Sequence, residues 1–132
     1  MHAEQRLRRS RPYHWGAIYI NGVDCQEHFD IDFHGSDAPV LSTASHIAVT
    51  VVHPDAIEEE EAGVVTLDVR VRAQRAADMP YEVAFDVPSG TLSIGDADGF
   101  DEVTLRPGRW LLQFAVDHPA EARHVEIVMS PH

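Results

Sequence analysis

The chain has 132 residues, of which 44% are hydrophobic and 24% charged, so it has the size and composition of one globular domain and not of a disordered or membrane-spanning protein. Its formal net charge of −12 disfavours binding to nucleic acid or to anionic lipid, because like charges repel. Cys25 is the single cysteine and the start of the chain lacks the apolar run of a secretory signal, so we expect a cytoplasmic protein without internal disulfides.

The first twelve residues are basic, whereas the remainder of the chain is strongly acidic. Arginines stand at positions 6, 8, 9 and 11, and Glu4 is the one acidic residue beside them. Residues 13–132 hold six arginines against 21 aspartates and glutamates, which gives a net charge of −15. We interpret residues 1–12 as a solvated, flexible arm and residues 13–132 as a single domain. Excess acid is typical of soluble proteins, and it also accelerates encounter with a basic partner.

Two strands are expected near the start of the domain. Tyr13–Asn21 is rich in β-branched and aromatic residues and ends at the turn sequence Asn21-Gly22. Glu27–His34 alternates polar and apolar residues, which is the period of a strand with one buried face.

The polar positions of Glu27–His34 are candidate metal ligands. They are His28, Asp30, Asp32 and His34. Alternate residues of a strand lie on one side, about 6.6 Å apart, so two neighbours could share a zinc or iron ion. A solvent-exposed strand face needs the same polar alternation, and this second interpretation is favoured.

The next strand expected is Ile47–Val52, which ends at His53-Pro54. Asp55–Ala62 follows and has helical composition, but it is too short to be stable alone. It contains the acidic run Glu58, Glu59, Glu60 and Glu61. Repulsion among these carboxylates favours an extended loop, which is either an ordinary solvated segment or an attractive site for a basic partner.

The second half of the chain carries the clearest strand patterns. In Gly63–Ala73, valines and a leucine alternate with polar residues, and the same period of two recurs further along. The strands expected after it are Tyr81–Val87, Thr91–Ile94, Val103–Leu105, Arg109–Asp117 and His124–Met129. Turn residues such as Ser89-Gly90 and Pro107-Gly108 separate them. Seven or eight short strands without a long amphipathic helix predict an all-β fold, an antiparallel β-sandwich.

The segment Gly95–Glu102 brings four carboxylates together around two glycines. They are Asp96, Asp98, Asp101 and Glu102. Clustered oxygens suit calcium, but the spacing departs from the calcium-loop pattern because Gly99 directly follows Asp98. A solvated turn between strands is the favoured interpretation.

The sequence contains none of the motifs that compel a reaction. We find no nucleophile elbow, no glycine-rich phosphate loop and no paired metal-binding histidines on a helix. Cys25 stands between Asp24 and Glu27, and an acidic setting blunts a thiol as a nucleophile. We therefore expect neither an enzyme nor a cofactor.

The layout of Tyr81–Val116 resembles the C-terminal half of the competence protein J family, inhibitors of a bacterial DNA-entry nuclease, and related small immunity-type proteins. The motifs are EVAFDVPSG-TLSI followed by EVTLRPGRWLLQFAV. The Tyr13-His14-Trp15 sequence before the first strand, the length and the acid excess are also similar. The resemblance implies a cytoplasmic β-sandwich that occludes a nuclease or toxin with acidic side chains.

Two functions follow as hypotheses. The first is a protein-binding inhibitor or immunity protein that neutralises a basic nuclease or toxin, with contacts from the acidic run and the acidic turn. Those contacts are Glu58, Glu59, Glu60, Glu61, Asp96, Asp98, Asp101 and Glu102. The alternative is a metal- or calcium-dependent binding module built on the same sandwich.

Overall fold

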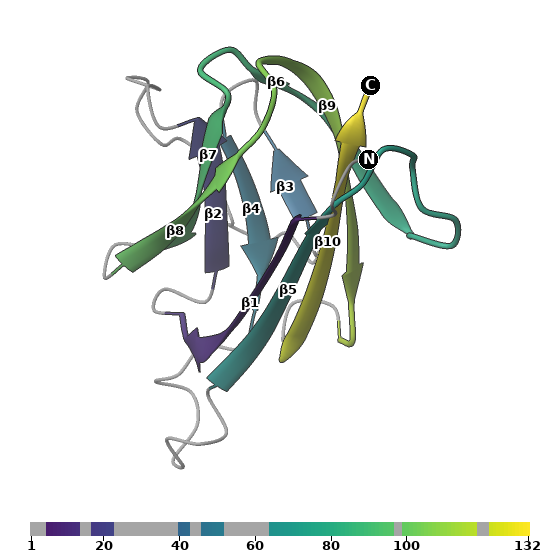
Figure 1. Cartoon of the computed structure of the whole chain (residues 1–132). Helices are drawn as coiled ribbons and strands as arrows, with labels where there is room; N and C mark the ends of the chain where they lie inside the picture. The colour runs from purple at the N-terminus through teal and green to yellow at the C-terminus, as the bar shows by residue number, and fades with distance from the viewer. Residues whose placement is uncertain are drawn as a thin grey trace.

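The structure is a computed structural model that describes residues 5–13, 17–22, 40–42, 46–51, 64–96, 99–118 and 122–132. Within these ranges, ten strands form two five-stranded sheets (Figure 1). The strands are β1 Gln5–Pro12, β2 Ala17–Gly22, β3 Val40–Ser42, β4 His46–Thr50, β5 Val64–Val71, β6 Tyr81–Val87, β7 Thr91–Asp96, β8 Gly99–Thr104, β9 Gly108–Val116 and β10 His124–Pro131. The predicted all-β sandwich is confirmed, with ten strands in the described part instead of seven or eight.

The strand order is β1-β5-β10-β9-β6 in the first sheet and β3-β4-β2-β7-β8 in the second. Neighbouring strands are antiparallel except β5 and β10, which run parallel with Leu67 opposite Val125. This one pair departs from the antiparallel pairing that the sequence predicted. Parallel strands need a long connection, and here the chain forms β6 to β9 before β10 returns beside β5.

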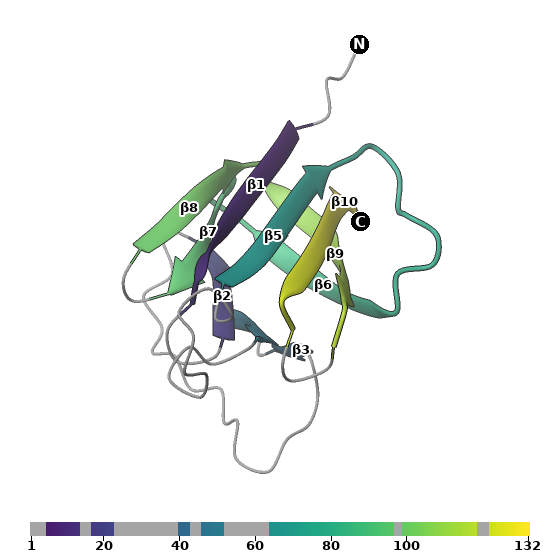
Figure 2. The ribbon, with the colours of Figure 1, turned by 90° about the horizontal axis from the view of Figure 1, so that it is seen from below.

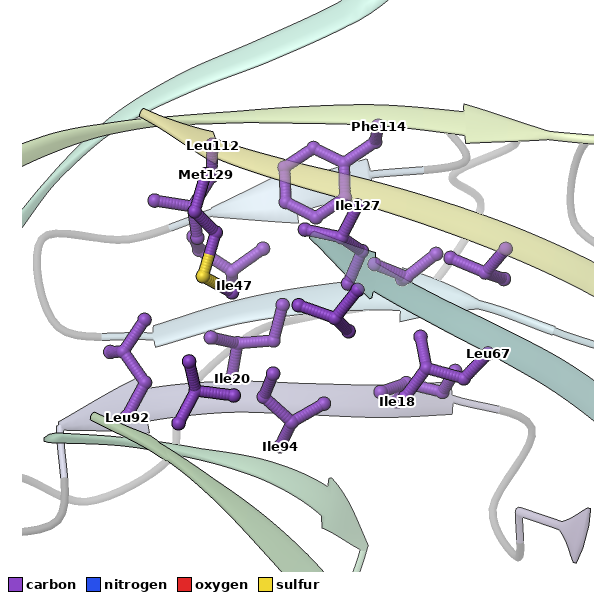
Figure 3. Packing of buried hydrophobic residues seen from close by; sticks show 14 of the residues in the cluster. Ile18, Ile20, Ile47, Leu67, Leu92, Ile94, Leu112, Phe114, Ile127 and Met129 are labelled. Carbon is purple, nitrogen blue, oxygen red and sulfur yellow. The ribbon is translucent and has the colours of Figure 1, made fainter. Parts of the chain in front are cut away.

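The core lies between the two sheets, where the inward residues of both interdigitate (Figure 3). The predicted alternation in β5 is confirmed, since Val65, Leu67 and Val69 are buried. The residues that pack with them include Ile18, Ile20, Ile47, Val49, Phe85, Leu92, Ile94, Leu112, Phe114, Val125, Ile127 and Met129. A fully buried side chain of this size contributes roughly 1.5–3 kcal/mol by leaving water, so this layer supplies most of the driving force for folding.

Residues 5–12 are strand β1 at the edge of the first sheet, and the expectation of a flexible arm is wrong for them (Figure 2). The strand pairs antiparallel with β5, placing Leu7, Arg9 and Arg11 opposite Val69, Leu67 and Val65. Those three side chains therefore lie on the inner face, where Leu7 packs against the core. The strand was not predicted because two of its inward positions, Arg9 and Arg11, are charged.

The predicted turn Gly95–Glu102 is wrong for most of its length. Strand β7 continues to Asp96 and β8 begins at Gly99, where these two residues pair across the hairpin. Only two positions, 97 and 98, stand between the paired strands. The pair Asp96–Gly99 is the last one of the hairpin and follows the pair Gly95–Phe100.

Several predicted features lie outside the described residues. They are the strand Glu27–His34 with its candidate ligands His28, Asp30, Asp32 and His34, the segment Asp55–Ala62 with Glu58 to Glu61, and Cys25. In the part of the chain that the structure describes, no three His, Cys, Asp or Glu side chains are arranged to hold a metal ion. The same residues include no helix long and apolar enough to cross a membrane.

Candidate partner-binding surface on the β7–β8 hairpin

The β7–β8 hairpin forms one border of the second sheet and carries the described part of the predicted acidic site. Because side chains alternate along a strand, Asp101 and Val103 of β8 face the core side. Phe100, Glu102 and Thr104 face outward, and all three are exposed. The two predicted carboxylates of β8 therefore point to opposite sides and do not form one cluster.

The predicted contacts have different surroundings. Glu102 is exposed on the outer face, opposite Ser93 of β7. Asp101 is only 20% exposed and accepts a hydrogen bond from Arg9. Asp96 ends β7, but its side chain lies outside the described part, as do Asp98 and Glu58 to Glu61.

Two arginines of β1 hold β8 from the inner side. Arg9 Nε donates to Asp101 Oδ1 at 2.8 Å, and a nitrogen of Arg11 donates to the Gly99 carbonyl oxygen at 2.7 Å. The Arg11 guanidinium also lies 4.2 Å from the centre of the Tyr13 ring, a cation–π contact. These contacts join the edge of the first sheet to the edge of the second. They also give the Asp101 carboxylate a cationic partner, which disfavours the calcium interpretation.

Phe100 was not among the candidate contacts predicted from the sequence. Phe100 is 61% exposed on the outer face of β8, and it is the one exposed large hydrophobic residue among the described residues. If the alternation of inward and outward residues is continued from the inward Val103 toward the N-terminus, Phe100 falls on the outward face of the strand. The predicted strand began at Val103, so this signal was lost.

Gly95 lies directly opposite Phe100 in the hairpin. A Cβ atom added at Gly95 would stand 2.6 Å from Phe100 Cα and 2.8 Å from Phe100 Cβ, closer than real Cβ contacts allow. It would also collide with the Gly99 carbonyl oxygen. Gly95 is thus required for the two strands to approach at this point, and an aromatic residue opposite a glycine is a pairing that sheets use to compensate for the missing side chain.

The strand register continues this row across the outer face of the second sheet. Gly95 is opposite Tyr19 of β2, Tyr19 is opposite Ala48 of β4, and Ala48 is opposite Leu41 of β3. The Tyr19 and Leu41 side chains are half-buried. Phe100 is therefore the exposed end of a row of apolar and aromatic positions.

A shallow pocket of about 510 Å³ lies over the outer face of the first sheet. Its lining includes Arg75, Glu82, Leu111 and His132. The Glu82 carboxylate accepts hydrogen bonds from Arg75 and from the Gln113 amide. The two charged side chains of this lining, Arg75 and Glu82, are therefore paired with each other.

The side-chain amide of Gln113 holds the segment between β5 and β6 over the outer face of the first sheet. Gln113 is fully buried; its Oε1 accepts from the Ala76 backbone N–H at 2.8 Å and its Nε2 donates to the Ala76 carbonyl at 2.9 Å. The side chain thereby holds the segment between β5 and β6 against β9. These two hydrogen bonds give Gln113 a structural role.

No family model and no curated protein matches this sequence. Among solved structures, the fold is similar to that of ComJ, an inhibitor of the DNA-degrading activity of NucA, from Bacillus subtilis, with a TM-score of 0.69 and 9% identity over 99% of this chain and 100% of that one. It is also similar to the protein of crocagin biosynthetic gene J, with a TM-score of 0.63 and 16% identity over 99% of each chain. At these identities the likeness shows a shared fold, which confirms the structural resemblance predicted from the motifs.

Proposed function

We propose that this chain is a protein-binding inhibitor that neutralises a basic nuclease or toxin. The observation that carries the proposal is the similarity to ComJ along nearly the whole chain, because ComJ inhibits a nuclease. At 9% identity, the similarity to ComJ shows a shared fold alone. Inhibition by this chain is the step that we propose.

Charge supports the same function. A nuclease must hold a polyanion, so its substrate-binding surface is basic. A chain with a net charge of −12 is attracted to such a surface, and complementary charge raises the association rate. Glu102 remains a proposed contact because it is exposed, whereas the carboxylate of Asp101 is engaged by Arg9.

Degradation of a labelled DNA duplex by NucA tests the proposal. We expect an equimolar amount of this protein to slow degradation, and the inhibition to weaken as salt is added. Divalent cation is kept in large excess, so that capture of the cation by carboxylates cannot imitate inhibition. An unrelated acidic protein of similar net charge is the control. Degradation that proceeds at the uninhibited rate with a tenfold excess of the protein at low salt would rule the proposal out.

The second structural neighbour favours one other candidate. Because the protein of crocagin biosynthetic gene J shares the fold, a second candidate is a non-enzymatic binding protein that acts within a biosynthetic pathway. The NucA assay separates the two, since a pathway-binding protein has no reason to inhibit DNA degradation.

A further inference from the structure

We propose that Phe100 is the apolar anchor through which this protein docks onto a basic protein, with Glu102 as the charged contact beside it. This inference rests on the proposed function and identifies the surface that would contact the partner. The occupant is a protein surface with an apolar recess bordered by lysine or arginine side chains.

The exposure of Phe100 is the first observation. A phenylalanine that is 61% exposed keeps most of its ring in water, and burying that ring in a partner would release the water around it. Single exposed apolar residues are common, and the register opposite Gly95 already favours an aromatic residue here. What distinguishes Phe100 is its position at the exposed end of the row through Tyr19 and Leu41.

The way in which β1 holds β8 is the second observation. Phe100 has two neighbours in the chain, and both are fixed from the inner side: Arg11 binds the Gly99 carbonyl and Arg9 binds the Asp101 carboxylate. The Phe100 backbone is also close to Gly95 on the adjacent strand. The ring therefore projects from a backbone fixed on three sides. A fixed anchor loses less conformational entropy on binding, which favours affinity.

The charge around Phe100 selects the partner. Glu102 stands two positions further along the same outward face, about 6.6 Å away by strand geometry. Arg9 and Arg11 contact β8 through the inward Asp101 side chain and the Gly99 backbone, so the outward face of β8 carries a carboxylate beside the ring. An aromatic anchor with acidic neighbours matches a recess with basic neighbours, the arrangement in which a buried side chain slows dissociation and charges speed association.

Binding kinetics with immobilised NucA test this surface. We expect Phe100→Ala to weaken the affinity at least about 30-fold, mainly through faster dissociation, as for an anchor residue. Glu102→Gln should mainly slow association at low salt. The matched controls are Thr104→Ala, on the same face of β8, and Glu126→Gln, an exposed strand carboxylate on the first sheet. Both should bind within about twofold of the wild-type protein, on the general rule that contacts outside the anchor are nearly neutral.

Hydroxyl-radical footprinting of the wild-type protein gives a readout that needs no folded variant. We expect oxidation of Phe100 to fall in the complex with NucA, while a reference residue on the first sheet, Tyr81, remains unchanged. Wild-type binding with undiminished Phe100 oxidation, or wild-type affinity in a folded Phe100→Ala variant, would refute this surface and leave the proposed function standing. Failure of the wild-type protein to bind NucA at low salt would refute both.

Discussion

Arg9 Nε donates a hydrogen bond to Asp101 Oδ1 at 2.8 Å and joins the edge strand of one sheet to the edge strand of the other. An open strand edge is a template for pairing with other chains, and inward-pointing charges are one way in which proteins block it. The arginine-rich start of the chain therefore belongs to the fold, and its charge is placed where it closes one side of the sandwich.

We expect the Arg9–Asp101 pair to contribute a coupling energy of about 0.2–1 kcal/mol, because half-exposed ion pairs are screened by water. A double-mutant cycle with Arg9→Ala and Asp101→Ala, measured by urea unfolding, gives this value. The pair Arg109–Asp86 is the control: its atoms are 3.4 Å apart and its side chains are 55% and 68% exposed. A coupling for Arg9–Asp101 no larger than that of the control would show that the edge link is not energetically significant.

We expect Gly95→Ala to lower the free energy of unfolding by about 1–3 kcal/mol, because overpacking forces the backbone to shift. The added Cβ would collide with Phe100 Cα and with the Gly99 carbonyl. Gly99→Ala is the matched control on the opposite strand, since a Cβ there meets no atom of the described residues within 4 Å. Chemical unfolding of the two variants checks the difference, and equal stability of both would contradict the close approach of the strands.

Strands β5, β6 and β10 were predictable because their inward positions are apolar and their outward positions are mostly polar. In β6, for example, Phe85 and Val87 are buried while Asp86 between them is exposed. The local pattern is a direct consequence of one wet and one dry face. The pairing of β5 with β10 was not predictable, because no local pattern encodes contacts between segments so far apart in the chain.

Strand β1 and the first part of β8 were not predicted, because their polarity is inverted. In β8 the inward Asp101 is charged and the outward Phe100 is apolar, which is the reverse of an ordinary surface strand. In β1 the inward Arg9 and Arg11 are charged. The sequence could name Glu102 as a contact from charge alone, but it could not show that Asp101 is engaged by Arg9, since that pair depends on the three-dimensional fold.

We expect Gln113→Ala to lower the free energy of unfolding by about 2–4 kcal/mol, because it removes two hydrogen bonds to Ala76 and leaves a cavity in a buried layer. Gln74→Ala, an exposed position in the same connecting segment, should change stability by less than about 0.5 kcal/mol. Thermal and urea unfolding of both variants measures the difference. A Gln113→Ala variant as stable as Gln74→Ala would contradict the anchoring role.

We expect Asp117 to stabilise the fold in a pH-dependent manner. Burial raises its pKa, but hydrogen bonds from the backbone N–H groups of Arg123 and His124, at 2.9 and 3.1 Å, outweigh burial and lower the pKa below its ordinary value. The unfolded chain then binds more protons between the two pKa values. The stabilisation is therefore present above about pH 4 and is lost as the pH falls through the lowered folded-state pKa.

Comparison of wild-type protein with Asp117→Asn across this pH range measures the effect of that carboxylate. The difference in free energy of unfolding should be largest at neutral pH and should shrink as the solution is acidified below about pH 4. A difference that stays constant from neutral to acidic pH would contradict the lowered pKa.

We expect calcium at millimolar concentration to leave the melting temperature of the protein unchanged, because the Asp101 carboxylate is engaged by Arg9. A ligand bound only by the folded state must raise the melting temperature. Thermal unfolding with calcium and with a chelator makes the comparison. A calcium-dependent rise that disappears in Asp101→Asn would favour the calcium-dependent binding module over this expectation.

Calorimetric titration of NucA with the wild-type protein is the decisive measurement for the proposal that this acidic sandwich binds a basic protein. We predict saturable binding with one copy of each protein in the complex, and an affinity that falls as salt is raised. Absence of saturable binding at low salt would contradict the claim.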